Sequence, residues 1–212
     1  MCGICGIAWT SDREPPEAAV VDRMTDVLAH RGPDDRGVWR DDDAGVALGF
    51  RRLSIIDLST GSQPMSNEDG SIWIVFNGEI YNFQALRHRL EGNKHTFRTS
   101  SDTETILHLY EDEGPECGQR LRGMFAFAIW DRRERRLMIA RDRLGVKPLV
   151  YRHEPERLVF ASELKSLLQI PDIPRELDPT ALDHYLALQY VPHPRTIFRG
   201  IHKLPPAHYA LW

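Results

Sequence analysis

Two cysteines near the start of the chain could carry chemistry. Cys2 follows the initiator methionine, and Cys5 stands three residues later in an apolar run. A C-x-x-C pair is typical of redox motifs that follow a strand, and of half a zinc site when a second pair exists. No strand-like run precedes this pair, Cys117 stands alone, and His30 and His95 lack ligand spacing with either cysteine. The sequence therefore argues against a metal or redox pair.

Position gives the two cysteines different expected roles. A cysteine inside an apolar strand is usually a small core residue, which is the expectation for Cys5. Removal of Met1 would place the Cys2 thiol and a free α-amine on one residue. An α-amine has a pKa of about 7.7–8.0, so near neutral pH a useful fraction can act as a base toward the thiol. Position alone leaves open the alternative that Cys2 is an incidental residue at the terminus.

Composition excludes several classes of function. The 212 residues are 42% hydrophobic and 27% charged, which is typical of a globular chain with a real core. The formal net charge of -4 argues against a nucleic-acid partner. No apolar run approaches the ~20 residues of a membrane span, and no signal peptide is visible. The odd number of cysteines, three, argues against a disulfide framework, so we expect a cytoplasmic protein with no membrane partner.

Apolar runs and turn residues predict two groups of strands with helices outside them. Asp131–Arg136 is expected as a solvated hairpin tip, and Ser101 and Glu104 as a capping box that opens a helix. The even spacing of the last four strands indicates antiparallel hairpins. Strands are expected near 5–9, 45–50, 71–76, 124–130, 137–140, 148–151 and 158–161, and helices near 20–28, 83–90, 101–110, 162–168 and 181–188. These elements predict an α+β fold in which two sheets face each other.

Nine stretches in order along the chain resemble the glutaminase domain of glutamine-hydrolysing asparagine synthetases, which are class II amidotransferases. They are CGICGI from Cys2, RGPD after His30, LSIID after Arg52, SQPM after Gly61, GEIYN after Asn77, DTETILHLY after Ser101, MFAFAIWD after Gly123, DRLGVKP after Arg141 and SELKSLL after Ala161. The resemblance implies an N-terminal nucleophile hydrolase fold, a four-layer α/β/β/α sandwich of two antiparallel sheets. The glutaminase domain is expected to fill residues 1–212, with its core at 2–168. Residues 171–212 are expected as a Pro-rich helical excursion that returns toward a synthetase domain absent from this chain.

The resemblance also implies which residues react. Cys2 resembles the family's nucleophile and general base combined. Asn77, through its side-chain amide, and Gly78, through its backbone N–H, match the oxyanion hole, and a tetrahedral oxyanion needs two such donors. Without the resemblance, Asn77–Gly78 would be taken as a type I′ hairpin turn.

Three charged residues match the groups that recognise the rest of glutamine. Arg52 matches the clamp on the α-carboxylate, for which a guanidinium has a suitable fork geometry. Glu79 and Asp102 match the acids that hold the α-ammonium group, and Asp102 also suits the first turn of a helix. The residues expected to line the substrate slot, mostly with backbone, are Leu53, Ser54, Ile55 and Ile56. The stretch 31–34 is expected as a structural turn, and Arg141–Asp142 as an ion pair inside the sandwich.

The implied reaction is hydrolysis of L-glutamine to L-glutamate and ammonia through a Cys2 thioester. The sequence has no Ser-Gly-Gly-x-Asp adenylating loop and no G-x-x-x-x-G-K-[ST] phosphate loop. We therefore expect no cofactor and no metal in this chain, with ATP and magnesium serving only a synthetase domain that amidates aspartate. The expected partners are L-glutamine and that domain, or a separate ammonia-accepting protein, with a homodimer left open. The alternatives are a glutaminase domain for another acceptor and a non-catalytic glutamine-binding module.

Overall fold

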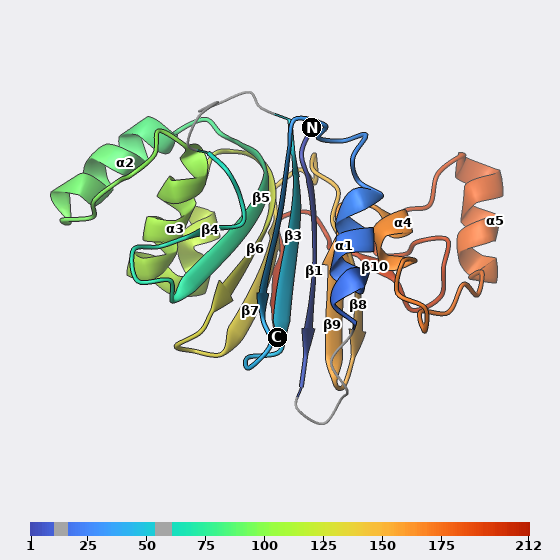
Figure 1. Ribbon diagram of the computed structural model, residues 1–212. Helices are drawn as coiled ribbons and strands as arrows, with labels where there is room; N and C mark the ends of the chain where they lie inside the picture. The colour runs from blue at the N-terminus through green and yellow to red at the C-terminus, as the bar shows by residue number, and fades with distance from the viewer. Residues whose placement is uncertain (11–16, 54–60) are drawn as a thin grey trace.

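The computed structural model describes residues 1–10, 17–53 and 61–212, and its strands form two antiparallel sheets (Figure 1). The strands are β1 Gly3–Trp9, β2 Asp35–Asp41, β3 Val46–Arg52, β4 Met65–Ser66, β5 Ile72–Ile80, β6 Gly123–Asp131, β7 Arg136–Arg141, β8 Val150–Glu154, β9 Arg157–Ala161, β10 His202–Lys203 and β11 Tyr209–Leu211. One sheet has the order β10-β8-β9-β1-β3-β2, and the other has the order β11-β7-β6-β5-β4.

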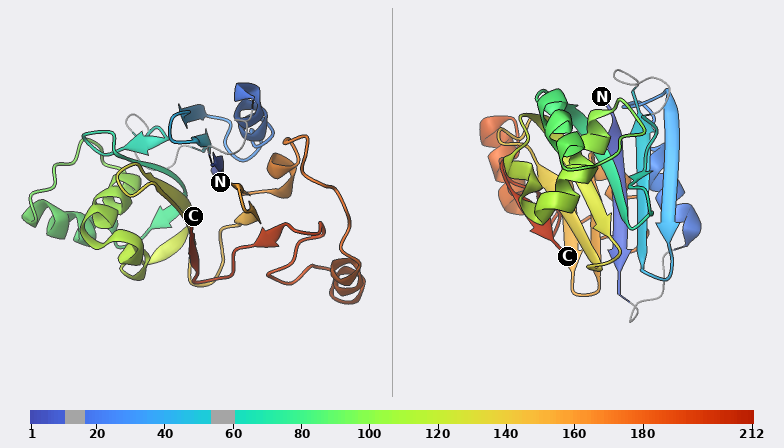
Figure 2. Two further views of the ribbon diagram at one scale, coloured as in Figure 1. Left: turned by 90° about the horizontal axis from the view of Figure 1, so that it is seen from below. Right: turned by 90° about the vertical axis from the view of Figure 1, so that its left-hand side faces the viewer.

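Helices cover the outer faces of both sheets. They are α1 Ala18–Asp26, α2 Phe83–Gly92, α3 Asp102–Glu113, α4 Leu164–Leu167 and α5 Pro179–Leu188, and a 3₁₀ helix follows α3 at Gly114–Gln119. Buried side chains of α2 and α3 pack on the five-stranded sheet, and those of α1 and α4 pack on the six-stranded sheet. Figure 2 shows the same order of layers from two further directions, with α5 lying outermost. The predicted α/β/β/α sandwich is therefore confirmed.

A shared core lies between the sheets. Side chains of β1 point alternately toward this core and away from it, and this alternation decides which cysteine faces the core. Ile4 and Ala8 belong to this inner core together with side chains of β5 and β6. Cys5 belongs to the outer core beneath α1, is fully buried, and has its Sγ 3.4 Å from the Thr25 hydroxyl. Because positions three apart on a strand face opposite sides, Cys2 packs against the inner core and cannot pair with Cys5. Cys5 is thus the expected core residue, and burial raises the pKa of its thiol to about 11.

Strand pairing resolves three local features. Asn77–Gly78 lies inside β5, paired with Ala126 and Phe125 of β6, and does not form the hairpin turn that the dipeptide alone would favour. The predicted antiparallel hairpins of the last four long strands are confirmed, and they lie in different sheets, because β7 pairs with β6 whereas β8 pairs with β9. β2 was not predicted, since this polar edge strand has no apolar run, although its Trp39 stacks on Trp73 with ring centroids 4.4 Å apart.

The loop between β7 and β8 is organised by Arg141 and Asp142, which bond to backbone and not to each other as an ion pair. The Arg141 guanidinium donates to the carbonyl oxygens of Lys147, Gly145 and Leu204 at 2.6–2.7 Å. The Asp142 carboxylate accepts the backbone N–H of four residues, Phe125, Leu144, Val146 and Lys147. A guanidinium with several donors and a carboxylate with several acceptor sites can satisfy a whole turn in this way.

Several helix ends also depart from the predicted pattern. Ser101 caps α3 by accepting the N–H of Thr103, but the Glu104 carboxylate accepts the N–H of Arg98 and Thr99 and does not complete the capping box. α1, at Ala18–Asp26, begins and ends two residues before the predicted range of 20–28. The predicted helix at 162–168 is the single turn α4.

The last part of the chain returns to both sheets. β10 pairs with β8 at the edge of one sheet, and β11 pairs with β7 at the edge of the other. Between α4 and β10 in the sequence, the chain forms α5, whose N-cap Asp178 accepts the N–H of Thr180 and Ala181. Across residues 1–10, 17–53 and 61–212, no helix is long and apolar enough to cross a membrane.

Candidate active site

One pocket contains the predicted site residues that the structure describes. They are Cys2, Arg52, Leu53, Asn77, Gly78, Glu79 and Asp102. The pocket lies where β1 begins and β3 ends, so both sheets contribute to it. Ser54, Ile55 and Ile56, predicted to line the same slot, lie outside the described residues.

Cys2 lies at the edge of the inner core, where its thiol contacts the backbone of Leu53. The N–H of Leu53 lies 3.5 Å from the Cys2 Sγ, and the thiol lies 3.7 Å from the Leu53 carbonyl oxygen. Burial raises the pKa of the Cys2 thiol, and this effect outweighs the opposing contact with Leu53 and the positive charges of the chain terminus, Arg52 and Lys147. The thiol is therefore protonated near neutral pH and needs a base before it can attack a carbonyl.

The amine at the start of this chain belongs to Met1, which is joined to Cys2 through an amide bond. Burial lowers the pKa of this Met1 α-amine. The α-amine of Cys2 itself becomes free only when Met1 is removed. Met1 itself is 57% exposed, so it can be reached for removal.

Asn77 extends from β5 toward the inner core that Cys2 also contacts. Its neighbours Phe76 and Ile80 point to the helix side of the sheet, which leaves Asn77 and Glu79 on the inner face. Asn77 is 1% exposed, yet its side-chain Nδ2 has no hydrogen-bond partner among the described residues. A buried amide without a partner costs free energy unless a ligand supplies an acceptor.

Gly78 presents a second donor beside Asn77. The N–H of Phe76 is bonded to the Gln63 side chain at 2.6 Å, and the N–H of Ile80 to the Asp102 carboxylate at 2.9 Å. Alternate N–H groups of a strand point to the same side, so the Gly78 N–H faces the pocket between these two contacts. A Cβ at Gly78 would lie 2.3 Å from the Met124 carbonyl oxygen, so only glycine fits against β6.

Two carboxylates meet at the far side of the pocket. Asp102 is the first residue of α3, is 4% exposed, and receives the N–H of Ile80. Burial raises the pKa of Asp102 to about 6, the bond from Ile80 opposes this rise, and the charge of Glu79 adds to it. Above that pH two negative charges face one cavity, an arrangement that attracts an ammonium group.

Three residues of the site were not predicted from the sequence. Lys147, 5% exposed, lines the pocket, and its charge lowers the pKa of the Cys2 thiol. Gln63 fixes β5 through Phe76 and donates from its Nε2 to the Thr103 hydroxyl at 3.2 Å. Arg31, expected only as part of a turn, donates from its Nε to the Cys2 carbonyl oxygen at 2.9 Å and pairs with Glu163 at 2.8 Å. The stretches RGPD, SQPM and LGVKP carry these residues, but only their tertiary contacts show what they do.

A cysteine at the start of a central strand, between two facing sheets and beside unsatisfied donors, defines the N-terminal nucleophile hydrolase class of architecture. The glutamine phosphoribosylpyrophosphate amidotransferase of B. subtilis, solved with ADP and GMP, has this fold with a TM-score of 0.64 at 23% identity. That likeness covers 84% of this chain and 46% of the other. The chain belongs to the family described as the glutamine amidotransferase domain, which matches residues 1–212.

Curated relatives of the chain are much longer than 212 residues. "Asparagine synthetase [glutamine-hydrolyzing] 1" of Bacillus subtilis is 43% identical over 212 residues, which cover 97% of this chain and 32% of the relative. "Amidase chry2" of Gibberella zeae is 39% identical over 187 residues, covering 88% of this chain and 27% of the relative. The chain thus spans about a third or less of the length of these relatives.

Proposed function

We propose that the chain hydrolyses the side-chain amide of L-glutamine to L-glutamate and ammonia through a thioester on Cys2. The observation that carries this proposal is the unpartnered Asn77 amide, buried in the same pocket as the Cys2 thiol. With Met1 removed, the Cys2 amine takes the thiol proton, and the sulfur attacks the amide carbon. Asn77 Nδ2 and the Gly78 N–H stabilise the resulting oxyanion.

The remaining steps balance without a cofactor. The C–N bond breaks as the leaving nitrogen receives a proton from the Cys2 ammonium group, and ammonia departs. Water then attacks the thioester carbon, the C–S bond breaks, and the thiol recovers its proton as glutamate leaves. Arg52 binds the α-carboxylate, while Glu79 and Asp102 bind the α-ammonium group. A glutamine-binding module without activity would not need a thiol facing two oxyanion donors.

The ammonia is proposed to serve a synthetase domain that amidates aspartate, using ATP and magnesium outside these residues. The 43% identity to a glutamine-hydrolysing asparagine synthetase over the whole chain supports this acceptor. A different acceptor is the second candidate, favoured by the relative named an amidase. We propose the cytoplasm as the compartment, because Cys2 must stay a thiol and Cys2, Cys5 and Cys117 are all free.

A product assay tests the proposal directly. The purified chain, supplied with glutamine, aspartate and ATP, is expected to release glutamate and ammonia in equal amounts and to form no asparagine and no AMP. The reason is that these residues include a thioester-forming site but no adenylating loop. Absence of glutamate would contradict the glutaminase proposal. Formation of asparagine or AMP would contradict the proposal that aspartate is amidated by a domain outside these residues.

Alanine substitutions at Asn77 and at Arg52 are expected to change different kinetic constants. Asn77→Ala should lower kcat by about 10²–10³ with little change in KM, because its amide acts mainly on the transition-state oxyanion. Arg52→Ala should mainly raise KM for glutamine, because the carboxylate contact exists in the ground and transition states alike. Steady-state kinetics of both variants distinguish these patterns, and an exchange of the two would show that the roles are misassigned.

A further inference from the structure

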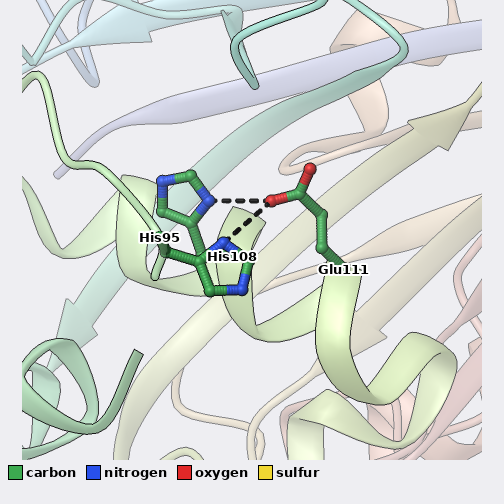
Figure 3. Close-up of side chains that lie close together, drawn as sticks. All are labelled: His95, His108 and Glu111. Carbon is green, nitrogen blue, oxygen red and sulfur yellow. Dashed lines mark hydrogen bonds and ion pairs between the residues drawn. The ribbon is translucent and has the colours of Figure 1, made fainter. Parts of the chain in front are cut away.

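Two histidines and a glutamate converge outside the glutamine pocket, at the junction of α2 and α3. Figure 3 shows both imidazoles turned toward the same carboxylate oxygen of Glu111. The Nδ1 of His108 lies 2.8 Å from Glu111 Oε2, and the Nδ1 of His95 lies 3.5 Å from it. One donor atom from each of the three residues lies within 4.8 Å of the other two. His108 and Glu111 come from α3, and His95 comes from the segment that precedes it.

Outer contacts orient these three side chains. The other ring nitrogen of His95 lies 2.9 Å from an oxygen of Asp112, whose second oxygen accepts from the Asn93 amide at 2.9 Å. The second oxygen of Glu111 accepts from the Asn67 amide at 2.7 Å. A carboxylate behind a histidine, and an amide behind a carboxylate, are the supports that metal ligands usually have.

His108 is the most buried member and the least satisfied. Its side chain is 1% exposed, and its Nε2 has no hydrogen-bond partner in the described parts of the chain. The nearest acceptors of Nε2 are carboxylate oxygens of Glu68 and Glu104, each 3.8 Å away. Four carboxylates, those of Glu68, Glu104, Glu111 and Asp112, therefore surround two imidazoles. Arg89 also places a positive charge near Asp112.

We propose that His95 Nδ1, His108 Nδ1 and the Glu111 carboxylate bind a divalent cation of the zinc class. Two imidazoles and one carboxylate suit Zn²⁺ and its transition-metal neighbours, whereas Mg²⁺ and Ca²⁺ prefer oxygen ligands alone. Zinc ligands lie about 2.0–2.2 Å from the ion, so tetrahedral donors are roughly 3.4 Å apart. The His95–Glu111 separation of 3.5 Å fits this spacing, and the His108–Glu111 contact of 2.8 Å has to open by about 0.6 Å. Water would fill the fourth position.

The site would add a metal link between two segments that already meet through hydrogen bonds, ion pairs and ring contacts. His95 stands in the connection that leads from α2 to Ser101 and Asp102, both of which line the glutamine pocket. His108 and Glu111 lie further along α3. A bound cation would anchor this connection to α3 and stabilise the folded chain, without touching glutamine. The expectation of no metal considered only partners for the cysteines and is revised by this proposal.

Calorimetric titration with ZnCl₂, after treatment with a chelator, tests the site without measuring activity. The wild-type chain and Cys2→Ala should each bind one zinc ion with similar affinity, which separates this site from the reactive thiol. His95→Gln should weaken binding at least tenfold, while His88→Gln, a change at an exposed histidine of α2, should leave it unchanged. MgCl₂ should not bind at this site.

Thermal stability provides an independent measurement. Zinc should raise the Tm of the wild-type chain and of His88→Gln, but not that of His95→Gln, since a ligand stabilises only the state that binds it. Equal zinc affinity in wild type and His95→Gln would overturn the proposal. Because neither readout involves glutamine, failure of this proposal leaves the proposed glutaminase function untouched.

Discussion

Replacing Cys2 with alanine is expected to abolish glutamine hydrolysis while the fold remains intact. In the proposed mechanism the sulfur forms the bond to the amide carbon, and no other described residue places a thiol in the pocket. The Cys2 side chain makes two long contacts with Leu53, at 3.5 and 3.7 Å, and is only partly buried against the inner core, so replacing its sulfur removes little native packing. Glutamate release should fall to the background of the assay, and the Tm should stay close to that of the parent chain.

Cys5→Ala is the matched control, because it removes the same atom three residues away. Cys5 is fully buried beneath α1 and contacts Thr25, so its loss should lower the free energy of unfolding by about 1 kcal/mol. Turnover should remain near the parent value. If Cys5→Ala stopped turnover and Cys2→Ala did not, the assignment of the nucleophile would be wrong.

An N-terminal extension that stays attached to Cys2 is expected to inactivate the enzyme. Acylation converts the basic α-amine into a planar amide, which cannot accept the thiol proton or deliver a proton to the leaving nitrogen. The buried thiol, whose pKa is raised, would then have no base at hand. The extra residues would also leave the pocket past Leu53 and Asn77, where the glutamine carbonyl has to bind.

The same extension at the other end of the chain is the control. The termini lie at opposite ends of the sandwich (Figure 1), so residues added after Trp212 stand away from the pocket. Glutaminase rates should be compared for uncleaved N-terminal and C-terminal tags, with intact-mass spectrometry identifying what precedes Cys2. Full activity of the N-terminally tagged chain would show that Cys2 does not act through a free terminal amine.

The long buried strands were predictable because a short apolar run bounded by turn residues is typical of a strand covered on both faces. β1, β5 and β6 cross the middle of the sandwich, and their sequences show this burial directly. β2 and β4 could not be found in the same way, since one is polar and the other has two residues. β7 and β8 follow one another in the chain but belong to different sheets. This separation depends on the turn that Arg141 and Asp142 build, which spacing alone does not reveal.

The site was predictable to the extent that its residues carry a family pattern. Asn77 and Gly78 illustrate the limit, because local turn statistics favour a hairpin and only the resemblance reversed that interpretation. Lys147 and Arg31 act through distant partners, so their roles depend on how the two sheets meet. His95 and His108 show the same limit. Their rings meet because a connection folds back onto α3, which ligand spacing in the sequence does not predict.

The central place of β1 has a consequence for how the protein folds as it is synthesised. Cys5 pairs with Gly49 on one side of β1 and with Ala161 on the other, so β1 completes its pairing only with a strand far along the chain. Such non-local pairing slows folding, whereas the β6–β7 and β8–β9 hairpins join neighbours in the chain. Cys2, which directly precedes β1, is thus among the last residues to reach its working position. During that interval the amino terminus stays accessible for the removal of Met1.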